Sequence, residues 1–198
     1  IGARVVSITN QDIRSYAQWG LTEYYDTRIK INFSDPDAIR KLADDISPPD
    51  LFIHAGLGGM TKPNESIHLE KNFIEAKYLI EGIFGLGVEQ FILVGSIEEY
   101  GNRSGTLVET MLPLEPLRKY EAGKRKVCQY GLETARRHGA IYTHVRLSNV
   151  LGTPQRRGSL IDSLHKAYQE NNIANLGHCL NGRDYLHIDD VGAAMVKI

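Results

Sequence analysis

The sequence predicts an α/β protein with a largely parallel sheet, and three observations lead to this expectation. Short apolar, β-branched runs recur along the chain, at residues 4–9, 29–33, 51–53, 91–94 and 141–150. Helix-like segments lie between them, of which 67–84 and 117–131 are the clearest. Small or polar residues follow some of the runs directly, as at His54 and Ser96. Binding sites of open α/β sheets form at the carboxyl ends of strands, so these positions are where function is expected.

The composition is that of an ordinary globular chain of 198 residues with a net charge of −1. Nothing in it favours nucleic acid or an anionic membrane as a partner. No long apolar run or signal peptide is present, so a soluble, cytoplasmic protein is expected. The two cysteines, Cys128 and Cys179, lack metal-site spacing and are expected to be reduced, buried thiols, so no metal is predicted. The chain begins with Ile1 and not Met, which suggests a fragment.

The segment 117–131 is expected to form the helix around which the function is organised. It places Tyr120 four residues before Lys124, so both side chains project from one helical face. An ammonium beside a phenol favours the phenolate, and such a pair can donate and accept protons near neutral pH. With ten tyrosines in the chain, the pattern alone also fits a solvated helix face.

Ser96 is the second candidate, because it follows the apolar run 91–94, where that strand should end. The alternative is a serine that only caps a turn or a helix.

Taken together, these segments resemble the extended short-chain dehydrogenase/reductases, the epimerase/dehydratase family that acts on nucleotide sugars. The resemblance lies in the order Gly95-Ser96-x-x-x-Tyr100-Gly101, then an acid-and-proline stretch, then Tyr120-x-x-x-Lys124. It implies that Tyr120 exchanges a proton with the sugar, that Lys124 holds the nicotinamide ribose, and that Ser96 positions the reacting oxygen. It also implies a homodimer packed through helices, including the one that carries Tyr120.

The resemblance implies a Rossmann-like, doubly wound parallel sheet and a bound NAD or NADP. The family's first strand and glycine-rich loop are not found in the sequence, and the cluster Gly82-x-x-Gly85-x-Gly87 is better explained as a helix stop. Cofactor contacts are expected from Asn10, Asn32, Asn72, Lys124 and the turn His54-Ala55-Gly56. No acid follows the strand at 4–9, whereas Arg14 lies nearby, which favours NADP. His54 could instead be a packed histidine, and Asn72 a surface residue.

The resemblance also implies substrate contacts and a division of the chain. Residues 1–150 would form the dinucleotide-binding domain, 151–186 part of a substrate-binding lobe, and 187–198 a return to the first domain. The expected substrate-binding residues are Glu98, Asn149, Arg156, Arg157 and Arg183. Arg156 and Arg157 could pair with phosphate oxygens or remain flexible surface arginines. Asp189 or Asp190 is expected to cap the last helix.

These implications converge on an enzyme, an NAD(P)-dependent oxidoreductase that works at a sugar carbon of a nucleotide sugar. The sequence around Ser96, Gly-Ser-x-x-Glu-Tyr-Gly, is most similar to that of reductases of 4-keto-6-deoxy nucleotide sugars. An epimerase is equally compatible with the catalytic residues. Two alternatives stay open. Glu98 stands where dehydratases of the family place a glutamate, although Ile97 replaces their acid, and a 4,6-dehydratase is therefore the first alternative. A non-catalytic Rossmann-like binding protein would explain the missing glycine loop.

Overall fold

The computed structural model describes residues 3–10, 25–56, 62–153, 155, 158–180 and 182–198. The chain divides into two compact units, Ile1–Arg146 and Leu147–Ile198, which are described separately. No helix within the described ranges is both long and apolar enough to cross a lipid bilayer.

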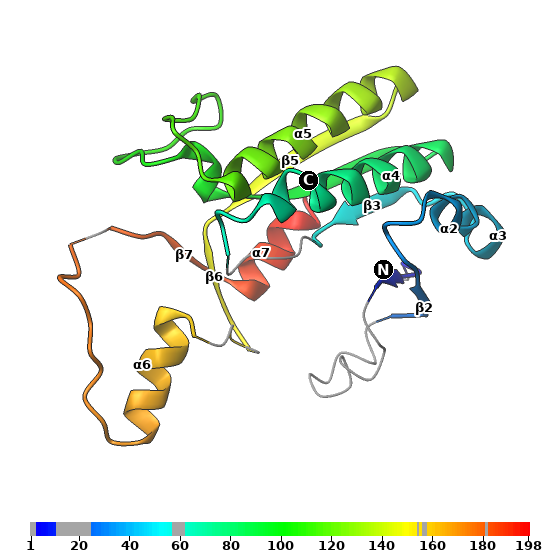
Figure 1. Ribbon diagram of the computed structural model, residues 1–198. Helices are drawn as coiled ribbons and strands as arrows, with labels where there is room; N and C mark the ends of the chain where they lie inside the picture. Colours follow the sequence, from blue (N-terminus) through cyan, green and yellow to red (C-terminus); the bar gives the residue numbers. More distant parts are fainter. Residues whose placement is uncertain (1–2, 11–24, 57–61, 154, 156–157, 181) are drawn as a thin grey trace. The chain divides into compact units, whose positions relative to one another are not determined.

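The first unit contains two sheets of short strands (Figure 1). In one, β1 (Val6–Thr9) pairs in parallel with β2 (Thr27–Lys30). In the other, the order is β3 (Leu51–His54), β4 (Gln90–Ser96), β5 (Ile141–Leu147), and β3 runs parallel to β4. A doubly wound sheet has the order 3-2-1-4-5-6. Within each sheet the neighbours follow that order, and helices alternate with the strands, so the expected Rossmann-like sheet is confirmed.

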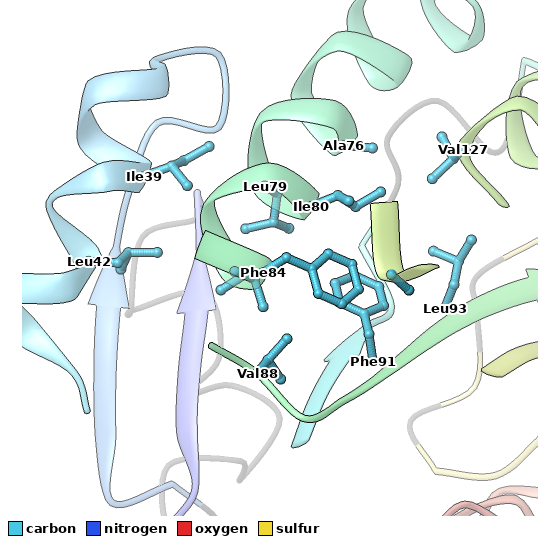
Figure 2. Close-up of a cluster of buried hydrophobic side chains, with 12 residues drawn as sticks. Ile39, Leu42, Ala76, Leu79, Ile80, Phe84, Val88, Phe91, Leu93 and Val127 are labelled. Carbon is cyan, nitrogen blue, oxygen red and sulfur yellow. The ribbon is translucent and has the colours of Figure 1, made fainter. Parts of the chain in front are cut away.

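The helices of this unit build its core. Two short helices, α2 (Pro36–Arg40) and α3 (Leu42–Asp45), follow β2, and Asp35 caps α2. The longer helices are α4 (Lys71–Gly85) and α5 (Lys119–His138), which pack side by side (Figure 1). Figure 2 shows the Phe84 ring of α4 stacked on that of Phe91 of β4, with centroids 5.2 Å apart, whereas Ile39 of α2 lies away from Phe91 and packs against α4 at Gly82. Burying such side chains contributes roughly 1.5–3 kcal/mol each, so this contact fixes α4 on the sheet.

Helix α5 runs past the end expected from the sequence, at Gly131, to His138. Gly131 does not stop the helix because it serves packing: a Cβ there would lie 2.6 Å from the Tyr142 ring. The helix ends instead at Gly139, which adopts the left-handed conformation with φ of 67°.

The second unit consists of β6 (Asn149–Leu151) paired in parallel with β7 (Tyr185–His187), and of α6 (Leu160–Gln169) and α7 (Ile188–Met195). The single strand expected at 141–150 is therefore wrong: β5 and β6 belong to different sheets. The cap expected from Asp189 or Asp190 is also wrong, because the His187 side chain accepts the Asp189 N–H and caps α7. Both cysteines are free, as expected, but Cys179 is exposed and not buried.

Candidate active site

Ser96 lies at the carboxyl end of β4 and caps the 3₁₀ turn η3 (Ile97–Tyr100). Its hydroxyl accepts the Glu98 N–H at 3.2 Å, and its own N–H donates to Glu99 Oε1 at 2.8 Å. The Ser96 side chain also accepts the backbone N–H of Glu99, and together with the bond from the Ser96 N–H to the Glu99 side chain this forms a capping box. The serine side chain also lies near the Tyr120 phenol, where it acts to lower the pKa of that group. The two explanations of Ser96 are thus compatible, since the cap holds the residue that meets the tyrosine.

Tyr120 and Lys124 lie in the first turns of α5, and both are buried. The Tyr120 N–H donates to the carbonyl of Pro63 at 2.8 Å, which ties the helix start to the loop before η2 (Ser66–His68). The Lys124 ammonium lies 5.9 Å from the centroid of the Tyr120 ring and donates to the Val94 carbonyl at 2.7 Å. The structure therefore brings Ser96, Tyr120 and Lys124 together beside the end of β4.

The electrostatics of this trio differ from the sequence expectation. Burial raises the pKa of Tyr120, hydrogen bonding to Ser96 opposes that rise, and the nearby carboxylates Glu99, Glu121 and Glu98 add to it. Burial lowers the pKa of Lys124 to about 8, although Glu99 acts in the opposite direction. The expected lowering of the tyrosine pKa by Lys124 is absent here, because the ammonium is turned to the Val94 carbonyl and burial dominates.

Asn72 is linked to Tyr120 through His68, which it contacts by a hydrogen bond and which packs against the Tyr120 ring. Its side-chain amide lies 3.2 Å from His68 Nδ1, and His68 Nε2 lies 2.9 Å from the Lys62 carbonyl. A carbonyl only accepts, so Nε2 carries the proton and Nδ1 accepts from Asn72. The imidazole then meets the Tyr120 ring edge-on, with centroids 5.3 Å apart. Asn72 is buried and not a surface residue, and it orders the wall against which Tyr120 packs.

The expected cofactor residues lie at strand ends. Asn10 directly follows β1, and Asn32 follows β2 and accepts the Ser34 N–H through its side chain at 3.1 Å. His54 ends β3, next to the exposed Ala55 and Gly56. Among the described residues, its buried Nε2 has no hydrogen-bond partner. Burial, with the charge of Lys124, lowers the pKa of His54 to about 4, so the imidazole is neutral.

Glu98 reaches out from η3 and is held by Arg118. Its Oε2 accepts from Arg118 Nη2 at 2.6 Å, and the same arginine pairs with the buried Glu121. This network links η3 to the start of α5, so the Glu98 carboxylate already has a cationic partner.

The other expected substrate residues belong to the second unit or lie outside the described residues. Asn149 belongs to the second unit, where its side-chain amide donates to the Asp184 carbonyl at 3.1 Å and supports the pairing of β6 with β7. Arg183 is exposed in the same unit. Arg14, Arg156 and Arg157 lie outside the described residues.

Sequence reasoning missed two residues that contact this trio, His68 and Glu99. Glu99 stands three residues after Ser96, which is the spacing of a capping box, so that signal was present in the sequence. His68 had no comparable signal, because its role depends on the packing of α5 against η2. In the described ranges, no group of His, Cys, Asp and Glu side chains could hold a metal ion.

The parallel strands, with Ser96, Tyr120 and Lys124 beside the end of β4, define a Rossmann-like protein of the extended short-chain dehydrogenase/reductase type. The chain belongs to the NAD dependent epimerase/dehydratase family, whose model matches residues 2–198. That family is NAD-dependent, in agreement with the expected nicotinamide cofactor. No curated protein matches the chain.

Solved structures share the fold. UDP-glucuronic acid 4-epimerase from Bacillus cereus, crystallised with UDP-glucuronic acid and NAD, has a TM-score of 0.79 at 20% identity, over 98% of this chain and 65% of the epimerase. UDP-glucose 4-epimerase from Thermotoga maritima gives 0.77 at 20% identity, over 96% and 72%. A dTDP-glucose 4,6-dehydratase from Streptomyces venezuelae gives 0.78 at 19% identity, over 97% and 61%. The chain thus spans less than two thirds of the first and third of these proteins.

Proposed function

We propose that this chain forms part of an NAD-dependent enzyme that oxidises and reduces a sugar carbon of a nucleotide sugar, with Tyr120 as the acid/base. The reactions that we favour are epimerisation of the sugar and reduction of a 4-keto-6-deoxy sugar. The observation that carries the proposal is the meeting of Ser96 with Tyr120, one helical turn from Lys124. The family and the epimerases of similar fold support it.

NAD fits the residues present at its nicotinamide end. The Nε2 of His54 is a buried polar atom at the end of β3 with no hydrogen-bond partner in the described part of the chain, and Lys124 is close enough to lower the pKa of that imidazole. Lys124 and the turn His54-Ala55-Gly56 would hold this end of the cofactor, and Asn10 and Asn32 the adenosine end. NAD, when bound, would accept hydride from the sugar carbon and return it.

The protein side chains would handle the proton and the orientation. Ser96 would hold the reacting oxygen, and Tyr120 would take its proton during oxidation and return it during reduction. Lys124, with its pKa lowered to about 8, can carry or release a proton at physiological pH. The raised pKa of Tyr120 favours the phenol as proton donor, which is the form needed when a ketone is reduced.

The 4,6-dehydratase is the less favoured reaction. It would need an acid at position 97, where an isoleucine stands, and a free base at Glu98, whose carboxylate binds Arg118.

Asn149, Arg156, Arg157 and Arg183 remain proposed substrate contacts. We also propose a homodimer through helices that include α5, and activity in the cytoplasm, which the free thiols of both cysteines support.

The substitution Tyr120→Phe tests the proposal, with Tyr130→Phe on the same helix as the control. Conversion of UDP- and dTDP-sugars in the presence of NAD is followed by NMR, and NAD binding by calorimetry. Tyr120→Phe should abolish turnover and leave NAD binding within about twofold, since the lost proton transfer is worth roughly 10²–10⁴-fold in rate. Turnover that survives in Tyr120→Phe would refute the acid/base assignment. Absence of NAD binding by the unaltered protein would favour the non-catalytic alternative.

A further inference from the structure

Glu99 and His144 form a buried pair directly behind Ser96. Glu99 Oε2 lies 2.9 Å from His144 Nε2, and the two side chains retain only 2% and 10% of their exposure. The other carboxylate oxygen accepts the Ser96 N–H at 2.8 Å. One carboxylate therefore joins the end of β4, which carries Ser96, to the neighbouring strand β5, which carries His144.

The backbone leaves room for this pair at Gly95. A Cβ at that position would lie 2.5 Å from Glu99 Oε1 and 2.6 Å from two ring atoms of His144, so no larger residue fits without displacing the pair. A carboxylate and an imidazole are both costly to bury, and their contact with each other and with the backbone offsets part of that cost.

The charges of the pair bear on the proposed catalytic residues. Burial alone would lower the pKa of His144, but the side chains of Cys128 and Glu99 outweigh it and raise the pKa to about 9. His144 is therefore an imidazolium at neutral pH. The negative charge of Glu99 in turn raises the pKa of Tyr120 and that of Lys124, so this carboxylate acts electrostatically on both proposed catalytic residues.

An anion near Tyr120 opposes loss of the phenolic proton. The Glu99 carboxylate nevertheless has to lie there, because it accepts the N–H of Ser96. The imidazolium of His144, which contacts Glu99, offsets the negative charge of that carboxylate. The other ionisable groups near the pair are Cys128 and Lys124 from α5 and Tyr142 from β5. Tyr142 is kept protonated because burial and then Cys128 raise its pKa. Of the two cations near Glu99, His144 is the one that contacts the carboxylate, whereas the Lys124 ammonium donates to the Val94 carbonyl.

We propose that Glu99 and His144 are positioning residues: Glu99 fixes the backbone of Ser96 against Tyr120, and His144 compensates the charge that this requires. The inference rests on the proposed acid/base role of Tyr120. It adds two residues to the site, neither of which is expected to touch the substrate.

The first test needs no turnover. The imidazole of His144 is titrated by NMR in the unaltered protein, in Glu99→Gln and in Glu98→Gln, a neighbouring carboxylate that binds Arg118 instead. The pKa of His144 should fall by about one unit or more in Glu99→Gln and stay unchanged in Glu98→Gln. Exchange of the Ser96 amide hydrogen should become about tenfold faster in Glu99→Gln, as expected when a charge-assisted bond becomes neutral. An unchanged His144 pKa or an unchanged Ser96 exchange rate would overturn the proposal.

The second test separates positioning from simple structural support. His144→Gln keeps a donor toward Glu99 but removes the charge, and it also serves if Glu99→Gln does not fold. In His144→Gln, kcat should fall about tenfold with KM changed less than about threefold, because the substrate is still bound but Tyr120 loses its proton less readily. An unchanged kcat would refute charge compensation. Turnover that survives Tyr120→Phe would instead refute the proposed function, while the NMR result on the pair would still hold.

Discussion

A methyl group added at Gly123 tests how closely the helix that carries Tyr120 and Lys124 approaches η2. A Cβ at Gly123 would lie 2.6 Å from the carbonyl oxygen of His68, 3.1 Å from its carbonyl carbon and 3.2 Å from its Cβ. The nearest of these atoms is backbone and cannot swing away. Ordinary contacts of a Cβ begin at 3.4 Å, so α5 and η2 must separate by roughly 0.8 Å if Gly123→Ala is to fit.

The expected cost combines two opposing terms. Overpacking of this kind costs about 1–3 kcal/mol. Alanine in a helix interior recovers up to about 1 kcal/mol relative to glycine. Gly123→Ala should therefore destabilise the protein by about 1–2 kcal/mol. The same displacement loosens the contact of the Tyr120 ring with His68, and misplacement by about 1 Å can reduce a rate by roughly 10²-fold.

Urea unfolding measures the stability term, with Gly85→Ala in α4 as the matched control. A Cβ at Gly85 would meet nothing within 4 Å, so that variant should be as stable as the unaltered protein or slightly more stable. If Gly123→Ala is also stabilised, α5 does not approach His68 as closely as the structure indicates, and the explanation of how Tyr120 is held is wrong.

Three further outcomes follow from burial and charge. Ile80→Ala should cost about 2–5 kcal/mol in urea unfolding, whereas Ile74→Ala on the exposed side of the same helix should cost under about 1 kcal/mol, and equal costs would contradict the assigned core. Lys124→Met should raise the pKa of His54 in an NMR titration, because the ammonium helps to lower it, and an unchanged value would place the two groups apart. The folded pKa of His144, about 9, exceeds its ordinary 6.5, so the contribution of this group to stability is complete below pH 6.5 and is lost as the pH rises to 9. His144→Gln should remove that loss, which is at most about 3.4 kcal/mol, and parallel curves of unfolding free energy against pH would refute this expectation.

Local pattern was sufficient to predict most elements and the residues that face one another within an element. The spacing of Tyr120 and Lys124 on one helix places both side chains correctly, because helical geometry alone relates residues four apart. The break after β5 could not be predicted in this way. Residues 141–150 are uniformly strand-like, and only pairing partners from β4 and β7, distant in the sequence, assign their two halves to different sheets.

The charge balance of the site was likewise beyond the sequence pattern. A Tyr-x-x-x-Lys pair suggests a cation that lowers the phenol pKa, yet the ammonium of Lys124 is directed at the Val94 carbonyl and the phenol is surrounded by carboxylates. Burial makes the largest contribution to the pKa of both Tyr120 and Lys124, and Glu99, which acts on both, pairs with His144 of another strand. Because burial and the contacts with Val94, Glu98 and Glu99 come from the fold, the motif indicates the side chains that we propose to react, and the surrounding structure sets their protonation.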